Sequence, residues 1–185
     1  NKEYFLVELI SAINFLVIFY FFGLSFESLL LIVLSVFFVI IFFIDLRHFI
    51  IPNELTFSLM ALGFIKSFLT NPSLFIFPDY IQSLIGGITG YFVIWFIIFI
   101  YKKLKDVEGM GLGDAKLLSA LGFWFGWIAL PFILIFSSVI ALVIAIPSLI
   151  NKSKNMRTQI PFGPYLILGC LFYLFFNDQI IKFLS

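Results

Sequence analysis

The sequence predicts an all-α integral membrane protein, a polytopic bundle of about seven transmembrane helices. Composition is the first observation behind this prediction: of the 185 residues, 63% are hydrophobic and 11% are charged. Soluble domains are about 45–50% apolar and about 25% charged. Length is the second observation. A spanning helix needs roughly 20 apolar residues, so 185 residues suffice for the helices and for little else.

Glycine, proline and charged residues divide the chain into separate apolar segments. We predict helices over residues 4–22, 27–44, 54–69, 80–101, 114–127, 128–150 and 162–183. Pro52 and Asn53 suit the start of the third of these helices. The segment at 114–127 is short and contains two glycines, so a re-entrant segment is the alternative to a full crossing there.

The basic residues predict the orientation of the bundle, because Lys and Arg near helix ends collect on the cytoplasmic side of a membrane. With an odd number of crossings, the amino terminus and the connections at 45–53, 101–113 and 151–160 share one face. That face would hold nine of the eleven basic residues, namely Lys2, Arg47, Lys102, Lys103, Lys105, Lys116, Lys152, Lys154 and Arg157. Lys66 falls near the outer end of its helix, where we expect its long side chain to reach the interface. A re-entrant segment at 114–127 would move the basic connection at 151–160 outside, so the charge bias favours a full crossing.

Charge and cysteine content exclude several kinds of function. A net charge of +1 with dispersed basic residues provides no electrostatic footprint for nucleic acid. Cys170 is the only cysteine, so the chain can form neither an internal disulfide nor a multi-cysteine metal site. The sequence starts at Asn1 and shows no cleavable signal peptide. We therefore expect no nucleic-acid partner and no metal.

Two aspartates stand out among the acidic residues. Asp45 follows the apolar run 36–44, and Asp114 follows the glycine-rich string 109–113. Two crossings separate them, so both lie at the same face of the membrane. Ionisable groups at this depth are costly and are functional candidates. Asp45 is the more unusual of the two, because a negative charge at the carboxy-terminal end of a helix opposes the helix macrodipole. Asp114 suits the amino-terminal helix end that it occupies.

Two carboxylates at the same depth can act as an aspartic protease pair. At close range they cannot both ionise, so they share one proton; one carboxylate takes a proton from water while the other donates a proton to the substrate. Gly109, Gly111 and Gly113 would form a backbone that can take positive φ and be approached closely by a peptide. A nucleotide-binding loop is disfavoured, because no strand precedes the glycines and no Lys-Ser/Thr pair follows them.

Other interpretations of the two aspartates remain open at this point. Both could cap their helices in an assembly scaffold without enzymatic activity. Alternatively, they could relay protons in a proton-coupled membrane carrier. Pro161, Gly163 and Pro164 break the chain before the last predicted helix, where they either begin that helix or shape a substrate entrance. His48 is interpreted as a solvated interfacial side chain.

The motifs resemble those of the type IV prepilin peptidase family, the bacterial G-x-G-D intramembrane aspartic proteases. Residues 108–118, 45–53 and 160–166 carry the resemblance, and residues 4–9 carry it more weakly. It implies that Asp45 and Asp114 are the catalytic residues. It implies cleavage of the short basic leader of type IV prepilins or pseudopilins at the cytoplasmic border of the bacterial inner membrane.

The resemblance also implies supporting residues, cofactors and partners. The implied supporting residues are Glu108, Gly111, Gly113 and Lys116. The peptidase reaction would need no cofactor, whereas S-adenosylmethionine is expected only if the chain retains the N-methyltransferase activity of bifunctional relatives. Those relatives have a zinc-binding region with two Cys-x-x-Cys pairs, so we expect a single transmembrane peptidase domain over residues 1–185 without that region. The expected partners are a prepilin or pseudopilin substrate helix and the lipid bilayer, and no oligomeric state is assigned.

Overall fold

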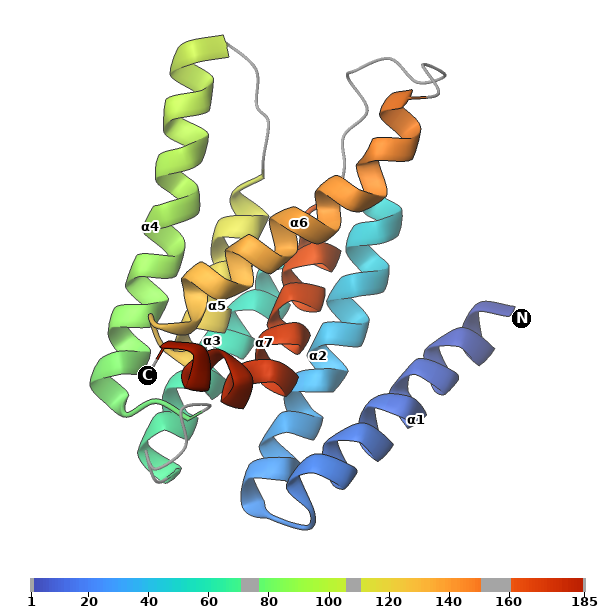
Figure 1. The fold of residues 1–185 in the computed structure, drawn as a ribbon, viewed down its shortest axis with the longest axis vertical. Coiled ribbons are helices and arrows are strands. Elements are labelled where there is room, and N and C mark those ends of the chain that lie inside the picture. The colour runs from blue at the N-terminus through green and yellow to red at the C-terminus, as the bar shows by residue number, and fades with distance from the viewer. Residues whose placement is uncertain (1, 71–76, 106–110, 151–160, 185) are drawn as a thin grey trace.

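Seven helices form the part of the chain that the computed structural model describes, which is residues 2–70, 77–105, 111–150 and 161–184. In chain order they are α1 (Lys2–Phe22), α2 (Phe26–His48), α3 (Asn53–Leu69), α4 (Tyr80–Lys105), α5 (Leu112–Phe125), α6 (Ala129–Ile150) and α7 (Gly163–Leu184), as Figure 1 shows. Each helix corresponds to one predicted segment. Within the described ranges no residue is in a strand, so the predicted all-α class is confirmed.

Two helices continue beyond their predicted ends. α2 includes Asp45 and ends at His48, and α4 continues to Lys105. Lys and Arg are good helix formers, and basic residues in a last turn interact favourably with the negative end of the helix dipole. Charge therefore does not end α2. The helix ends where Phe49 takes a left-handed conformation with φ 55°. As a result, Asp45 lies in the last turn of a helix and not in the following connection.

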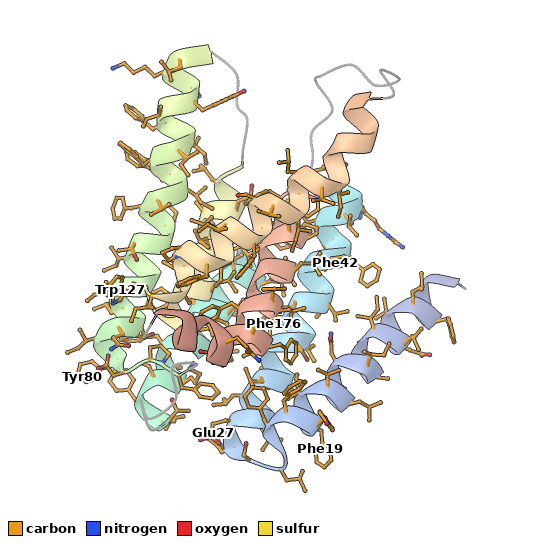
Figure 2. The ribbon with its side chains drawn as sticks, in the orientation of Figure 1. Phe19, Glu27, Phe42, Tyr80, Trp127 and Phe176 are labelled. Atoms are coloured by element: carbon orange, nitrogen blue, oxygen red, sulfur yellow. The ribbon has the colours of Figure 1, made fainter. Side chains whose placement is uncertain are left out.

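The outer surface of the bundle is apolar, as expected for a protein surrounded by lipid. Within the described residues, three helices contain stretches long and apolar enough to cross a membrane: Phe5–Phe22, Phe26–His48 and Tyr80–Leu104. Phe19, Tyr80 and Trp127 project outward from the bundle (Figure 2) and are each about half exposed. The chain is a multi-pass membrane helix bundle.

The short helix α5 lies inside the bundle and contacts α3, α4, α6 and α7. Ten of its 14 residues are buried. At about 1.5 Å per residue it is roughly 21 Å long, less than the roughly 30 Å of a bilayer hydrocarbon core. The predicted helix is thus present, but protein surrounds it. A full crossing by α5 stays a prediction.

Glycines bring α4 and α5 into close contact. A Cβ atom at Gly122 of α5 would overlap the carbonyl group of Gly86 on α4. Beside this contact, the Ser119 hydroxyl donates a hydrogen bond of 2.7 Å to the Gly87 carbonyl oxygen. Small residues allow membrane helices to approach closely enough for such packing. α4 therefore holds the position of α5.

The substitution Gly122→Val is expected to lower the free energy of unfolding by about 1–3 kcal/mol, because the added side chain would force the two backbones apart. Thermal unfolding in detergent micelles measures this change. Ala12→Val is the matched control, since Ala12 is exposed on α1. Equal unfolding temperatures for the two variants would contradict the close packing of α4 on α5.

Lys66 does not reach the interface, so the expectation from the sequence is wrong. Its side chain is 1% exposed, and its Nζ donates a hydrogen bond of 2.5 Å to the Trp124 carbonyl oxygen. The same Nζ lies 4.4 Å from the centre of the Phe77 ring. Carbonyl groups at the carboxy-terminal end of a helix carry negative partial charge, and aromatic faces attract cations. The end of α5 and the aromatic rings beside it therefore accommodate this lysine within the bundle.

Candidate active site

Asp45 lies in the last turn of α2, and its side chain is 4% exposed. Its Oδ2 accepts a hydrogen bond of 3.0 Å from the backbone N–H of Gly163. Gly163 is the first residue of α7, so this N–H has no acceptor within its own helix. The amino-terminal end of a helix dipole favours a negative charge. α7 thus compensates for the unfavourable position of Asp45 at the carboxy-terminal end of α2.

Asp114 lies in the first turn of α5, and its side chain is 8% exposed. Its Oδ2 accepts a hydrogen bond of 3.2 Å from the backbone N–H of Gly111. Its own backbone N–H donates a bond of 3.1 Å to the Gly111 carbonyl oxygen. Asp114 therefore bonds Gly111, the residue that precedes α5, and caps the start of this helix, as the capping interpretation predicted. A single carboxylate oxygen makes this contact, so capping is compatible with a catalytic role.

The two aspartates lie near each other at one end of the bundle. Ile51 packs between Gly113, which is next to Asp114, and Gly163, which bonds Asp45. Gly113, the neighbour of Asp114, faces Ile51 so closely that a Cβ atom on the glycine would lie 3.1 Å from the Ile51 Cβ. A Cβ atom on Gly163 would lie 3.0 Å from the Ile51 Cδ1 and 2.6 Å from Asp45 Oδ2. The fold therefore brings together two acids that lie far apart in the sequence.

Comparison with known proteins assigns the chain to a family. Residues 32–146, which include both aspartates and most of the helices that position them, match the type IV leader peptidase family. The chain belongs to the type IV leader peptidase family. This agrees with the resemblance seen in the sequence motifs.

Curated relatives of the family match almost the whole chain. Proteins named prepilin leader peptidase/N-methyltransferase are 38% identical in Xanthomonas campestris pv. campestris, 33% in Aeromonas salmonicida and 32% in Pseudomonas aeruginosa. Each alignment covers 98% of this chain but only 61–62% of the relative. The chain thus spans less than two thirds of the length of these relatives. No solved structure matches the chain.

Lys116 is one of the supporting residues that the family resemblance implies. It belongs to α5, and its side chain contacts α3. Its Nζ donates a hydrogen bond of 2.6 Å to the Asn53 side-chain oxygen and lies 5.7 Å from the centre of the Phe57 ring. Both partners belong to α3, so Lys116 joins the first turns of α3 and α5. Glu108 lies outside the described residues.

The glycines beside Asp114 do not take positive φ, so this part of the sequence prediction is wrong for Gly111 and Gly113. Gly111 is extended, with φ −88° and ψ 151°, and Gly113 is part of α5. The helix begins earlier than predicted, which leaves no turn at Gly113. A close neighbour is present at Gly113, but it is the Ile51 side chain, so approach by a substrate peptide stays a prediction. Among the described residues, the atoms nearest to a Cβ added at Gly111 would be the Asp114 Oδ2 and the Gly113 N, each 3.8 Å away, which is an ordinary contact distance.

The site also contains two residues to which the sequence interpretation gave no specific role. Gly163 was assigned to a helix start or a substrate entrance, and its hydrogen bond to Asp45 was not foreseen. The nearby prolines predicted a helix start there, and free N–H groups at a helix start favour anions, so a general signal was available. Ile51 carried no signal, because a single apolar residue in a short connection has no distinctive pattern.

Phe49 reverses the chain immediately after Asp45. It is the single non-glycine residue with positive φ among the described residues, and its side chain is 50% exposed. A left-handed conformation costs an L-residue with a Cβ atom roughly 1–2 kcal/mol, and glycine avoids this cost. This conformation directs the chain back toward the bundle.

We expect Phe49→Gly to be more stable than Phe49→Ala by about 1 kcal/mol, because both changes remove the ring but only glycine relieves the left-handed strain. The unfolding midpoints of the two variants in the same detergent provide the comparison. An alanine variant at least as stable as the glycine variant would show that the conformation at Phe49 is not costly.

Proposed function

We propose that this chain is the transmembrane peptidase domain of an intramembrane aspartic endopeptidase that removes the short basic leader from type IV prepilins or pseudopilins. The observation that carries the proposal is the pair of buried carboxylates of Asp45 and Asp114 at one end of the bundle, where Ile51 packs against Gly113 beside Asp114 and against Gly163, which bonds Asp45. Membership of the type IV leader peptidase family supports the same reaction. The names of the relatives support prepilins as the substrate class.

In the proposed mechanism, the two aspartates share one proton in the resting site. The ionised carboxylate takes a proton from a water molecule, whose oxygen attacks the scissile carbonyl carbon while the protonated carboxyl donates its proton to the carbonyl oxygen. Collapse of the tetrahedral intermediate breaks the peptide bond, and a proton passes to the leaving amine. Gly163 N–H holds Asp45, and Gly111 N–H holds Asp114, so neither carboxylate must reorganise during the reaction.

We place the cleavage at the cytoplasmic border of the bacterial inner membrane, after the glycine that ends the leader. The distribution of basic residues along the sequence supports this side, because the connections next to both aspartates belong to the basic face. A basic leader retained on that side would then bring its cleavage site to the level of Asp45 and Asp114. No metal or cofactor is required for this reaction.

The names of the relatives include a second activity, N-methyltransferase, and we propose the new amino terminus as the group that would be methylated. This activity would transfer a methyl group from S-adenosylmethionine to the amine that cleavage releases. We assign no residue to the methyl donor.

Cleavage of a prepilin by the full-length protein in liposomes tests the proposal. Mass spectrometry should show the leader peptide and a mature chain that begins after the leader glycine, without added metal or S-adenosylmethionine. Addition of S-adenosylmethionine tests methylation separately, as a mass increase of the mature chain. Absence of cleavage together with proton flux that depends on both aspartates would favour the proton-coupled carrier instead.

A further inference from the structure

Ile51 is the one buried residue of the connection between α2 and α3, which is residues 49–52. Its side chain is 7% exposed, whereas that of the adjacent Ile50 is 61% exposed. The left-handed conformation of Phe49 turns the chain after α2, and Pro52 precedes the first residue of α3. The connection therefore directs one aliphatic side chain into the end of the bundle where both aspartates lie.

The Cδ1 methyl group of Ile51 packs against two glycines, one next to Asp114 in the sequence and one hydrogen-bonded to Asp45. The Ile51 Cδ1 would lie 3.6 Å from a Cβ atom on Gly113 and 3.0 Å from a Cβ atom on Gly163. Gly113 is bonded to Asp114, and Gly163 donates a hydrogen bond to Asp45. The side chain thus fills the space between the first turn of α5 and the first turn of α7. Glycine at both positions leaves the room that Ile51 occupies.

We infer that Ile51 is a positioning residue that sets the separation of the Asp45 and Asp114 carboxylates. This inference rests on the proposed function, since it concerns the geometry of the same pair. Close-packed groups transmit a change in volume to their neighbours. Loss of the Ile51 side chain would therefore let the α5 and α7 ends move relative to each other, and each end holds one of the two acids.

The isoleucine pair at 50 and 51 provides a matched kinetic test. Ile51→Ala is expected to lower kcat for prepilin cleavage by about 10–100-fold, because misplacement of reacting groups by about 1 Å can cost 10²-fold. KM should change by no more than about twofold, because ground-state binding is retained. Ile50→Ala should leave both constants within about twofold of wild type, and Ile51→Leu, which restores the volume, should recover most of kcat. Equal kcat for Ile51→Ala and Ile50→Ala would overturn the inference.

A measurement of distance tests the inference without catalysis. In a Cys170→Ala background, Asp45→Cys and Asp114→Cys place two thiols at the site, and bifunctional thiol reagents of graded length report their separation. Addition of Ile51→Ala should shift the reagent length that gives the highest cross-linking yield, whereas addition of Ile50→Ala should not. An unchanged preferred length would overturn the inference. A shift in the cysteine pair, together with no prepilin cleavage by the protein that keeps both aspartates, would instead refute the proposed function and leave the role of Ile51 in spacing intact.

Discussion

Asparagine in place of either Asp45 or Asp114 is expected to lower the rate of prepilin cleavage by about 10²–10⁴-fold, because an amide cannot exchange the proton that the reaction requires. Asparagine has nearly the same shape and keeps an oxygen that can accept the hydrogen bonds from Gly163 and Gly111. The loss should therefore be in kcat, with little change in the fold. Initial rates of leader release over a range of prepilin concentrations measure it.

Asp79→Asn is the matched control for these two substitutions. The Asp79 carboxylate accepts a hydrogen bond of 2.7 Å from the Gln82 backbone N–H at the start of α4, so, like Asp114, it bonds a backbone N–H at the start of a helix. We expect this variant to cleave at close to the wild-type rate. The paired-aspartate mechanism is wrong if Asp45→Asn or Asp114→Asn cleaves as fast as the control.

Gly163→Ala is expected to have the second largest effect, a loss of about 10²-fold in kcat. Its Cβ would lie 2.6 Å from Asp45 Oδ2 and 3.0 Å from the Ile51 Cδ1, so the carboxylate would have to move away from the N–H that orients it. The same cleavage assay measures the effect, and thermal unfolding separates it from a loss of folded protein.

Gly111→Ala is the control that separates the steric effect of Gly163→Ala from a general effect of alanine next to an aspartate. Gly111 holds the other aspartate through the same kind of backbone hydrogen bond, but its φ of −88° suits any residue. The nearest atoms of the described residues to an added Cβ would lie at an ordinary contact distance of 3.8 Å. This substitution should reduce activity far less than Gly163→Ala. Comparable losses would mean that the steric contact at Asp45 is not what matters.

The fold could be predicted from local features of the sequence. Runs of apolar residues separated by glycine, proline and charge define helices in a bilayer, because every backbone group in lipid must be paired within its own segment. The same features predicted that Asp45 and Asp114 lie at the same face, Asp45 at the carboxy-terminal end of its helix and Asp114 at the amino-terminal end of another. Charged residues do not mark the end of α2, which continues through Asp45 and Arg47 until the left-handed conformation of Phe49 ends it.

The details of the site depend on contacts between distant segments. Asp45 and Gly163 are 118 positions apart, and no local pattern relates a carboxylate at the end of one helix to a particular N–H at the start of another. Ile50 and Ile51 are the same residue type, but the Ile51 side chain is buried and the Ile50 side chain is exposed. The turn at Phe49 determines which of the two lies inside. Lys66 was misjudged for a similar reason, because its acceptor belongs to α5 and not to its own helix.

The buried position of Lys66 has a consequence for biosynthesis. The ribosome completes α3 before it synthesises α5, so the Trp124 carbonyl group is absent when α3 first enters the membrane. A lysine near a helix end then extends to the interface, because a charged lysine at the centre of an inserting helix costs about 2.5–3.5 kcal/mol. We therefore expect the amine to extend to the interface until α5 is present. In the assembled bundle the amine instead bonds the Trp124 carbonyl oxygen, so the burial of this lysine depends on the presence of the helix that carries Asp114.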